Sequence, residues 1–352
     1  MSPSRFSLFL VAVAAMLFGT EGLLRRPLLD EMSVTSIVLA EHVLLAIFAV
    51  PIVFVHRRVI ARLSPRNWCA LLVIGWGASA GAALLFTRAL EVGNPTTASL
   101  LQNTQPLFVV LLATLLLKER LGGLYWPCLT VSIIGAYLLS FGTLSPVWIL
   151  NRGEINAAGY ALAAAALWAS GTVLARLVLT DLTYVTLTAA RFLLALPVLL
   201  VVALFNGVVG ESFAGIVASP VRLMAAAFIP GLVAVLLFYR GLENTKASYA
   251  VLAEFMYPAA ALVGNWMVLG TIITPLQALG CILLLATIFI LAWGPALTPA
   301  EKVAGAAGVL ADNAIVATAS RPRQSVGIAP VSAAGMKTLV GGHQRSHHPI
   351  DR

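Results

Sequence analysis

The chain has 352 residues, 60% of them hydrophobic and only 10% charged, and its formal net charge is +8. Soluble domains carry roughly a quarter charged residues, so this composition excludes an ordinary soluble protein and predicts one embedded in a lipid bilayer. The basic residues lie between apolar runs and near the C-terminus without interleaved aromatic residues, which argues against a nucleic-acid partner. The cysteines and histidines show no spacing typical of a metal site, so we expect neither a metal nor a cofactor.

Ten apolar segments are each long enough to cross a bilayer core, which takes about 20 helical residues. They span 6–24, 34–55, 68–87, 95–117, 124–141, 157–175, 184–205, 222–239, 247–269 and 275–294. No small-x-small cleavage pattern follows the first segment, so we expect a retained helix there and not a signal peptide. The sequence therefore predicts an all-α integral membrane protein with ten transmembrane helices.

One motif occurs twice in the chain. FTRALE begins at Phe86, and FYRGLE begins 152 residues later at Phe238. A proline follows each copy, and these prolines, Pro106 and Pro258, also lie 152 residues apart. An offset of this size in an apolar chain indicates duplicated halves rather than a short solenoid repeat. Each half has an odd number of helices, five, so the second half enters the membrane from the opposite side and the repeats are inverted.

This organisation predicts four regions. Residues 1–144 form the first five-helix repeat, 145–156 the linker and 157–294 the second repeat, while 295–352 have the composition of a disordered, basic cytoplasmic tail. Lysine and arginine are retained at the cytoplasmic face, so we expect both termini in the cytoplasm and a multi-pass protein of the bacterial inner (plasma) membrane. With this orientation the cytoplasmic connections carry Arg5, Arg57, Arg58, Arg62, Arg66, Lys118, Arg120, Arg176, Arg240 and Lys246, and the outer ones carry Arg25, Arg26, Arg88, Arg152 and Arg222.

These motifs resemble those of the EamA-type ten-helix permeases of the drug/metabolite transporter superfamily. The resemblance covers about 6–294 and rests on LFGTEG and LWASGT in the first helix of each half, FTRALE followed by LLLKERL, FYRGLE, and Arg191 in AARFLLAL. It implies two five-helix repeats and transport of a small organic metabolite, more often by export. The chain departs from the pattern at Glu41–His42, where the first half would carry an arginine, and at LGTIIT, where the second half would end its fourth helix with a glutamate.

Polar residues inside membrane helices usually face a cavity or a partner helix. Gln102 and Glu254 occupy repeat-related positions near the midplane, each four residues before a proline, and a proline in a helix frees the carbonyl four residues earlier. We therefore expect hinges that expose backbone for ligand binding, the alternative being a kink that serves only packing. The predicted substrate-binding residues are Gln102, Gln105, Glu254, Tyr257, Asn265, Arg191 and Trp168, and the predicted hinges are Pro106 and Pro258.

Three further residues are candidates for coupling transport to protons. A buried carboxyl group can exchange a proton near neutral pH, so Glu41 beside His42 could serve this role. The structural alternative pairs Glu41 with a basic residue of another helix, such as Arg191. Glu21 lies four residues before Arg25, which favours an ion pair at the outer end of the helix. The first-helix glutamate that the related small multidrug-resistance proteins use for cations and protons keeps the coupling role open.

The sequence favours a secondary transporter over an enzyme. It lacks an ATP-binding P-loop, so alternating access driven by a gradient or by exchange would move an amino acid, its derivative or another small organic solute. An integral-membrane enzyme would use Glu41 and His42 on a lipid-linked substrate, and a sensor or scaffold would use the tail to recruit a partner. The expected partners are a small-molecule substrate and the bilayer, with a homodimer left open.

Overall fold

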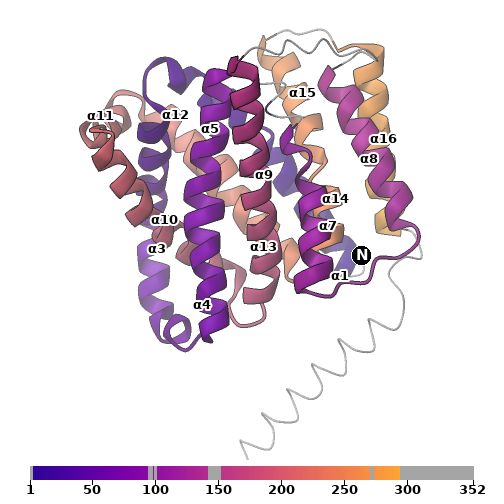
Figure 1. Ribbon diagram of the computed structural model, residues 1–352, viewed down its shortest axis with the longest axis horizontal. Coiled ribbons are helices and arrows are strands. Elements are labelled where there is room, and N and C mark those ends of the chain that lie inside the picture. Colours follow the sequence, from indigo (N-terminus) through magenta and orange to yellow (C-terminus); the bar gives the residue numbers. More distant parts are fainter. Residues whose placement is uncertain (1–2, 94–97, 99–100, 142–151, 270–272, 294–352) are drawn as a thin grey trace, which may run out of the picture. The chain divides into compact units, whose positions relative to one another are not determined.

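The computed structural model describes residues 3–93, 98, 101–141, 152–269 and 273–293, and these ranges contain helices and no strand (Figure 1). Seven helical stretches among them are long and apolar enough to cross a membrane, and further apolar helices are shorter. The expected all-α membrane fold is therefore confirmed. The expected tail, 295–352, lies outside the described residues.

Both halves contain a π-helical segment between two α-helices, η2 in the first half and η3 in the second. Those of the first half are α1 (Pro3–Phe18), α2 (Glu21–Arg25), η1 (Pro27–Asp30), α3 (Val34–Ala61), α4 (Pro65–Leu72), η2 (Val73–Gly81), α5 (Ala82–Val92), α7 (Gln105–Leu116) and α8 (Tyr125–Phe141). Those of the second half are α9 (Arg152–Val178), α10 (Tyr184–Phe205), α11 (Val209–Ala218), α12 (Pro220–Ala226), η3 (Ala227–Val233), α13 (Ala234–Leu242), α14 (Ala247–Ala253), α15 (Met256–Leu269) and α16 (Pro275–Trp293).

One helix boundary and one additional helix differ from the sequence expectation. Helix α9 begins at Arg152, inside the expected linker 145–156, because a helix can continue past the apolar run that hydropathy detects. The helix α11 was not expected, since its ten residues are too few to span a bilayer and include Glu211. Glu211 accepts hydrogen bonds from the N–H and hydroxyl of Ser33, so α11 is tied to the start of α3.

The first helix of each half packs against helices of the other half. The first helix of the chain, α1, packs against α13 and α15 of the second half, and α9 packs against η2, α5 and α7 of the first half. Helix α3 lies beside α10, and α8 lies beside α16, so equivalent helices of the two halves pair with each other. Both halves therefore contribute helices to the packed core that lies between them.

Helices α3 and α10, which are equivalent in the two halves, begin with equivalent N-cap residues. The Ser33 side chain accepts the N–H of Ser36 at the start of α3, and Thr183 accepts that of Thr186 at the start of α10. Ser33 and Thr183 lie 150 residues apart, as do Glu41 and Arg191. Each of these charged residues is therefore two helical turns from its cap and at the same depth in its half.

The fourth and ninth predicted helices are both interrupted, where continuous helices with proline kinks were expected. Turns at 103–104 and 254–255 precede α7 and α15, whose first turns contain Pro106 and Pro258. Proline is tolerated there because the first helical residues need no N–H donor. The expected free carbonyl of Glu254 is not found, since it accepts the Tyr257 N–H at 2.9 Å.

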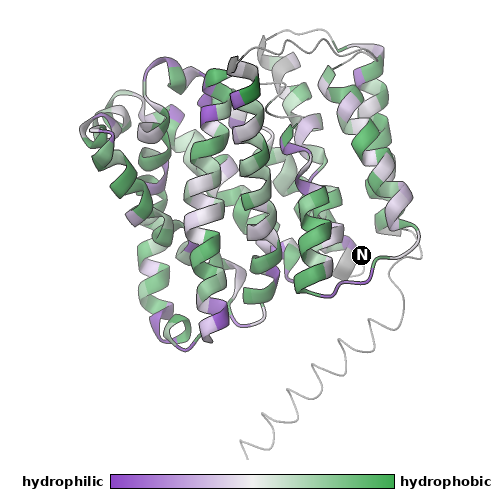
Figure 2. Ribbon diagram, in the orientation of Figure 1, coloured by the Kyte–Doolittle hydropathy of each residue, from purple (hydrophilic) through white to green (hydrophobic). Residues whose placement is uncertain are grey.

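The outward faces of the helices are apolar (Figure 2). Large hydrophobic side chains such as Phe54, Leu115, Phe205 and Met267 are more than half exposed. In water such a surface would aggregate, whereas in a bilayer it faces lipid tails. The chain is therefore a multi-pass membrane protein.

Candidate substrate site

A cavity lies between the two halves and, with its mouth, has an empty volume of about 1160 Å³. Its lining comes from repeat-related positions of both halves. Phe18 on α1 and Trp168 on α9 lie 150 residues apart and both line it, as do Ser79 on η2 and Gly231 on η3, 152 residues apart. The wide turns of η2 and η3 are π-helical, a local form that is frequent at functional sites. The site is thus shared between the repeats.

The first half places a buried ion cluster on this cavity. Arg25 donates to Glu41 at 2.9 and 2.5 Å, to Thr87 at 3.2 Å and to Glu21. All four side chains are buried. The expected Glu21–Arg25 ion pair is thus present but lies inside the protein, and the partner of Glu41 is Arg25 and not Arg191. Two carboxylates share one guanidinium, so the cluster carries an excess negative charge when both are ionised.

His42 lies next to this cluster on the cavity wall. Its Nδ1 is 2.9 Å from the carbonyl oxygen of Val38, and its Nε2 has no hydrogen-bond partner among the described residues. The imidazole packs edge-on against the ring of Phe192, with the ring centroids 5.8 Å apart. His42 and Phe192 are themselves 150 residues apart, so equivalent positions of the two halves meet here. Sequence reasoning proposed His42 for proton coupling but gave no sign of its contact with Phe192.

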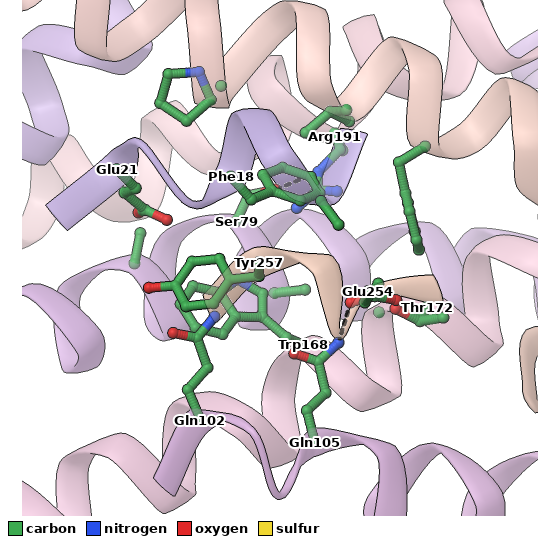
Figure 3. A pocket seen from close by; sticks show the side chains of 18 of the residues that line it. Phe18, Glu21, Ser79, Gln102, Gln105, Trp168, Thr172, Arg191, Glu254 and Tyr257 are labelled. Carbon is green, nitrogen blue, oxygen red and sulfur yellow. Dashed lines mark hydrogen bonds between the residues drawn. The ribbon is translucent and has the colours of Figure 1, made fainter. Parts of the chain in front are cut away.

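The second half places Arg191 on the cavity wall, where no described carboxylate pairs with it. Arg191 donates to the Ser79 hydroxyl at 2.7 Å and to the Tyr239 hydroxyl at 2.6 Å, and its guanidinium lies 5.4 Å from the centre of the Tyr239 ring. Within the described part of the chain it forms no ion pair. Both partners of Arg191 are neutral, so its charge remains available to an anionic group (Figure 3).

Glu254 stands at the helix interruption of the second half. The amide of Gln105, from the first half, donates to one carboxylate oxygen of Glu254 at 2.9 Å (Figure 3). The other oxygen is buried and has no hydrogen-bond partner among the described residues, and the same holds for Oε1 of Gln102 and Nδ2 of Asn103. Buried polar atoms usually have partners, so these three point to a ligand or water in the cavity. Gln102 and Glu254, the repeat-related pair, both line the cavity, and Glu254 is in direct contact with Gln105.

Most of the predicted site residues line this one cavity. The predicted residues that line it are Gln102, Gln105, Glu254, Tyr257, Arg191, Trp168, Glu41, His42, Glu21 and Pro106. Pro258 is not, and the side chain of Asn265 lies outside the described structure. Arg25, Ser79, Thr172 and Tyr239 line the cavity and were not predicted. Tyr239 belongs to the repeated FYRGLE motif, which was its only sequence signal.

Residues 5–141 and 155–293 each match the EamA-like transporter family. The chain belongs to this family. The two matches cover the helices of both halves, and EamA-like proteins are transporters, so the chain is a membrane transporter and not an enzyme. The alternative of an integral-membrane enzyme acting through Glu41 and His42 is therefore set aside.

Two curated relatives are also described as transporters. The riboflavin transporter ImpX of Fusobacterium nucleatum is 28% identical over 286 residues, which are 79% of this chain and 95% of the relative. An uncharacterised transporter of Methanothermobacter thermautotrophicus is 26% identical over 237 residues, which are 66% of this chain and 67% of the relative. A solved crystal structure shares the fold with a TM-score of 0.62 at 17% identity, covering 82% of this chain and 97% of the other.

Proposed function

We propose that this EamA-like transporter exports a small organic metabolite, such as an amino acid or a derivative, by alternating access around the central cavity. The observation that carries this proposal is the presence of one basic and one acidic side chain on the cavity wall. Arg191 has only neutral partners, and Glu254 is bonded only by the amide of Gln105 among the described residues. A substrate with both an acidic and a basic group complements such a site better than an uncharged drug does.

Each end of the substrate has a matching group. The guanidinium of Arg191 offers donors to a carboxylate, and the unbonded oxygen of Glu254 can accept a hydrogen bond from an ammonium group. Gln102 and Asn103 supply further polar atoms without partners among the described residues. Phe18, Trp168 and Tyr257 give the cavity an aromatic wall for the substrate's apolar part.

The interrupted helices supply the moving parts. In transporters built from inverted repeats, discontinuous helices surround the site while one half rocks against the other. Here the interruptions before α7 and α15 place Gln105 and Glu254 at the cavity, and Pro106 and Pro258 act as hinges beside them. The cluster of Glu21, Arg25 and Glu41 is the proposed site of proton coupling, because a proton would neutralise its excess negative charge. We assign the protein to the bacterial inner membrane with both termini in the cytoplasm.

Counterflow into proteoliposomes tests this proposal. Vesicles holding the purified full-length protein are preloaded with a mixture of unlabelled amino acids, and the uptake of each labelled amino acid is followed. We expect at least one to accumulate unchanged, and Glu254→Gln to lower that uptake about tenfold or more, because a neutral amide binds an amine less well than a carboxylate does. The conservative Gly159→Ala variant in α9, whose added methyl group meets nothing within 4 Å, should match the wild type. The amino-acid proposal fails if no labelled amino acid exchanges.

A flat heteroaromatic solute is the second candidate. The aromatic wall favours it, and one relative is described as a riboflavin transporter. Riboflavin is fluorescent and can be followed in the same vesicles. It has no amine for Glu254 to bind as a cation, so Glu254→Gln should impair its uptake less than that of an amino acid. Riboflavin exchange in the absence of amino-acid exchange would favour this second candidate.

A further inference from the structure

The end of α7 is shaped to turn one carboxylate toward the second half. Both Leu117 and Glu119 donate their N–H groups to the Ala113 carbonyl, at 3.1 and 3.2 Å. Between them Lys118 adopts a left-handed backbone conformation, with φ of 54°. Among the described residues it is the one non-glycine with positive φ. A left-handed residue at this place is a common helix stop, and it reverses the chain direction so that Glu119 reaches α14.

Glu119 caps the first turn of α14. One of its carboxylate oxygens accepts the Ala247 N–H at 2.9 Å, and the other accepts the N–H and hydroxyl of Ser248 at 3.2 and 2.5 Å. The hydroxyl of Tyr125, on α8, donates to the Ser248 carbonyl at 3.0 Å, and Ser248 is fully buried. Residues 119 and 125 belong to the first half and α14 to the second, so this contact holds the two halves together. We call it the Glu119 clamp.

The sequence does not provide the same clamp at the opposite face. Adding the repeat offset of 152 to Glu119 leads to Thr271, and subtracting it from Ala247 leads to Pro95. Threonine has no carboxylate, and proline has no N–H to donate. Both the acceptor and one donor of the clamp are therefore missing from the equivalent pair.

Another contact between the halves does occur at both faces. Asn67 donates to Asp181 at 2.6 Å, and the equivalent residues Ser219 and Glu31 are bonded at 2.5 Å. A contact that is matched at both faces does not favour one conformation of an inverted-repeat transporter over the other. The Glu119 clamp has no match in sequence and joins α14, which lines the cavity, so it does. The unmatched contacts at the opposite face, Glu211 with Ser33 and Arg222 with Glu31, come from α11 and α12, which do not line it.

The clamp lies beyond one end of the cavity. On α14 the lining begins at Val251, one turn inward from Ala247, whereas beyond the end of α1 it includes Glu21 and Arg25 on α2. Helix α1 starts at the end of the bundle where α7 is joined to α8, so Arg25 lies toward the other end (Figure 1). Glu119 thus closes the face that the cavity lining does not reach.

From this geometry we infer that Glu119 is a positioning residue that favours one closed state of the transporter. Its bonds to Ala247 and Ser248 hold the cavity shut at the Glu119 face and must break before the substrate reaches that face. This inference deepens the proposed alternating-access mechanism, but it concerns the empty protein and requires no particular substrate. Loss of the carboxylate should shift the population toward the state that is open at the Glu119 face.

A reporter cysteine can measure this shift without a substrate. In full-length protein with Cys69, Cys128 and Cys281 replaced by serine, Val251→Cys places a thiol on the cavity wall one turn inside the clamp. A membrane-impermeant maleimide is added to oriented vesicles from either face. We expect Glu119→Gln to raise labelling from the Glu119 face at least about fivefold, because hydrogen bonds to a charged group are lost, and to lower labelling from the other face.

Glu243→Gln is the matched control. Glu243 accepts the Tyr184 N–H at 2.9 Å and pairs with Arg240, so it also caps a helix, but all its partners belong to the second half. It should leave the labelling of both faces unchanged. Ser248→Ala, which keeps Glu119 but removes its 2.5 Å bond, should raise labelling in the same direction as Glu119→Gln. If both clamp variants label at the rate of the parent protein, or no more than Glu243→Gln does, the inference is overturned, whatever the outcome of the counterflow experiment.

Discussion

Arg25 and Arg191 both face the cavity, yet their surroundings make them different kinds of residue. Arg25 is enclosed by two carboxylates and a hydroxyl, whereas Arg191 is held by two hydroxyl groups. A buried charge without a counter-ion is costly in a membrane protein, so an arginine kept among neutral partners suits a role in ligand binding. An arginine already neutralised by carboxylates suits a role in structure or coupling.

The first prediction concerns the stability of the Arg25 cluster. Arg25→Gln should lower the free energy of unfolding by about 3–5 kcal/mol, because it leaves the buried carboxylates of Glu21 and Glu41 without a counter-ion. Adding Glu41→Gln should restore part of the loss. Thermal unfolding in detergent measures both effects. As a control, Arg88→Gln breaks an exposed ion pair with Glu91 and should cost less than about 1 kcal/mol. Equal losses for Arg25→Gln and Arg88→Gln would show that the cluster is not a buried ionic unit.

At the scale of elements, close contact between helices of different halves fixes the cavity wall. Helix α13 carries Tyr239, a partner of Arg191, and packs on α1, which carries Phe18. The two helices approach closely at Gly241, where an added Cβ would lie 2.6 Å from both the Ser7 carbonyl oxygen and a methyl group of Val11. A side chain at this position would have to push the two helices apart.

The second prediction follows from that contact. Gly241→Ala should destabilise the protein by about 1–3 kcal/mol, because the α1 backbone at Ser7 leaves no room for the methyl group. The melting temperature and the monodisperse fraction on size-exclusion chromatography measure the change. In contrast, Gly159→Ala on α9 adds a methyl group with nothing within 4 Å and should be neutral or stabilising. A wild-type melting temperature for Gly241→Ala would mean that α1 and α13 are packed less closely than described.

Elements that depend on local pattern could be predicted, and those that depend on contacts between distant segments could not. Apolar runs located the helices, and the repeated motif identified the two halves. The partner of Glu41 was not predictable, because Arg25 sits near a predicted helix end and only the fold turns it inward. The contact between Gln105 and Glu254 likewise joins residues 149 positions apart. Helix α11 has only ten residues and is too short to register as a membrane segment.

At the scale of the whole molecule, the basic residues between the helices fall mainly on one face in the predicted orientation. That face is the one that carries Lys118, Arg120 and the Glu119 clamp. In the proposed orientation, with positive charge retained in the cytoplasm, the clamp would lie on the cytoplasmic side. The state described here would then be closed to the cytoplasm.

The third prediction tests this orientation. A green fluorescent protein fused after Arg352 should fluoresce, and an alkaline phosphatase fused there should be inactive, since the phosphatase needs the oxidising exterior of the cell to form its disulfides. Fusion of both reporters to a truncated chain ending within the connection between α3 and α4, which carries Arg62, should give the same result. An active phosphatase at either site would reverse the assigned orientation and place the clamp outside.

The π-helical turns in η2 and η3 also record how the molecule arose. A π turn holds one more residue than an α turn, and the two segments end at Gly81 and Val233, which are equivalent positions 152 residues apart. One inserted residue in an ancestral five-helix chain, copied when its gene was duplicated, accounts for both. The widened turn is then older than the duplication that joined the two halves into one chain.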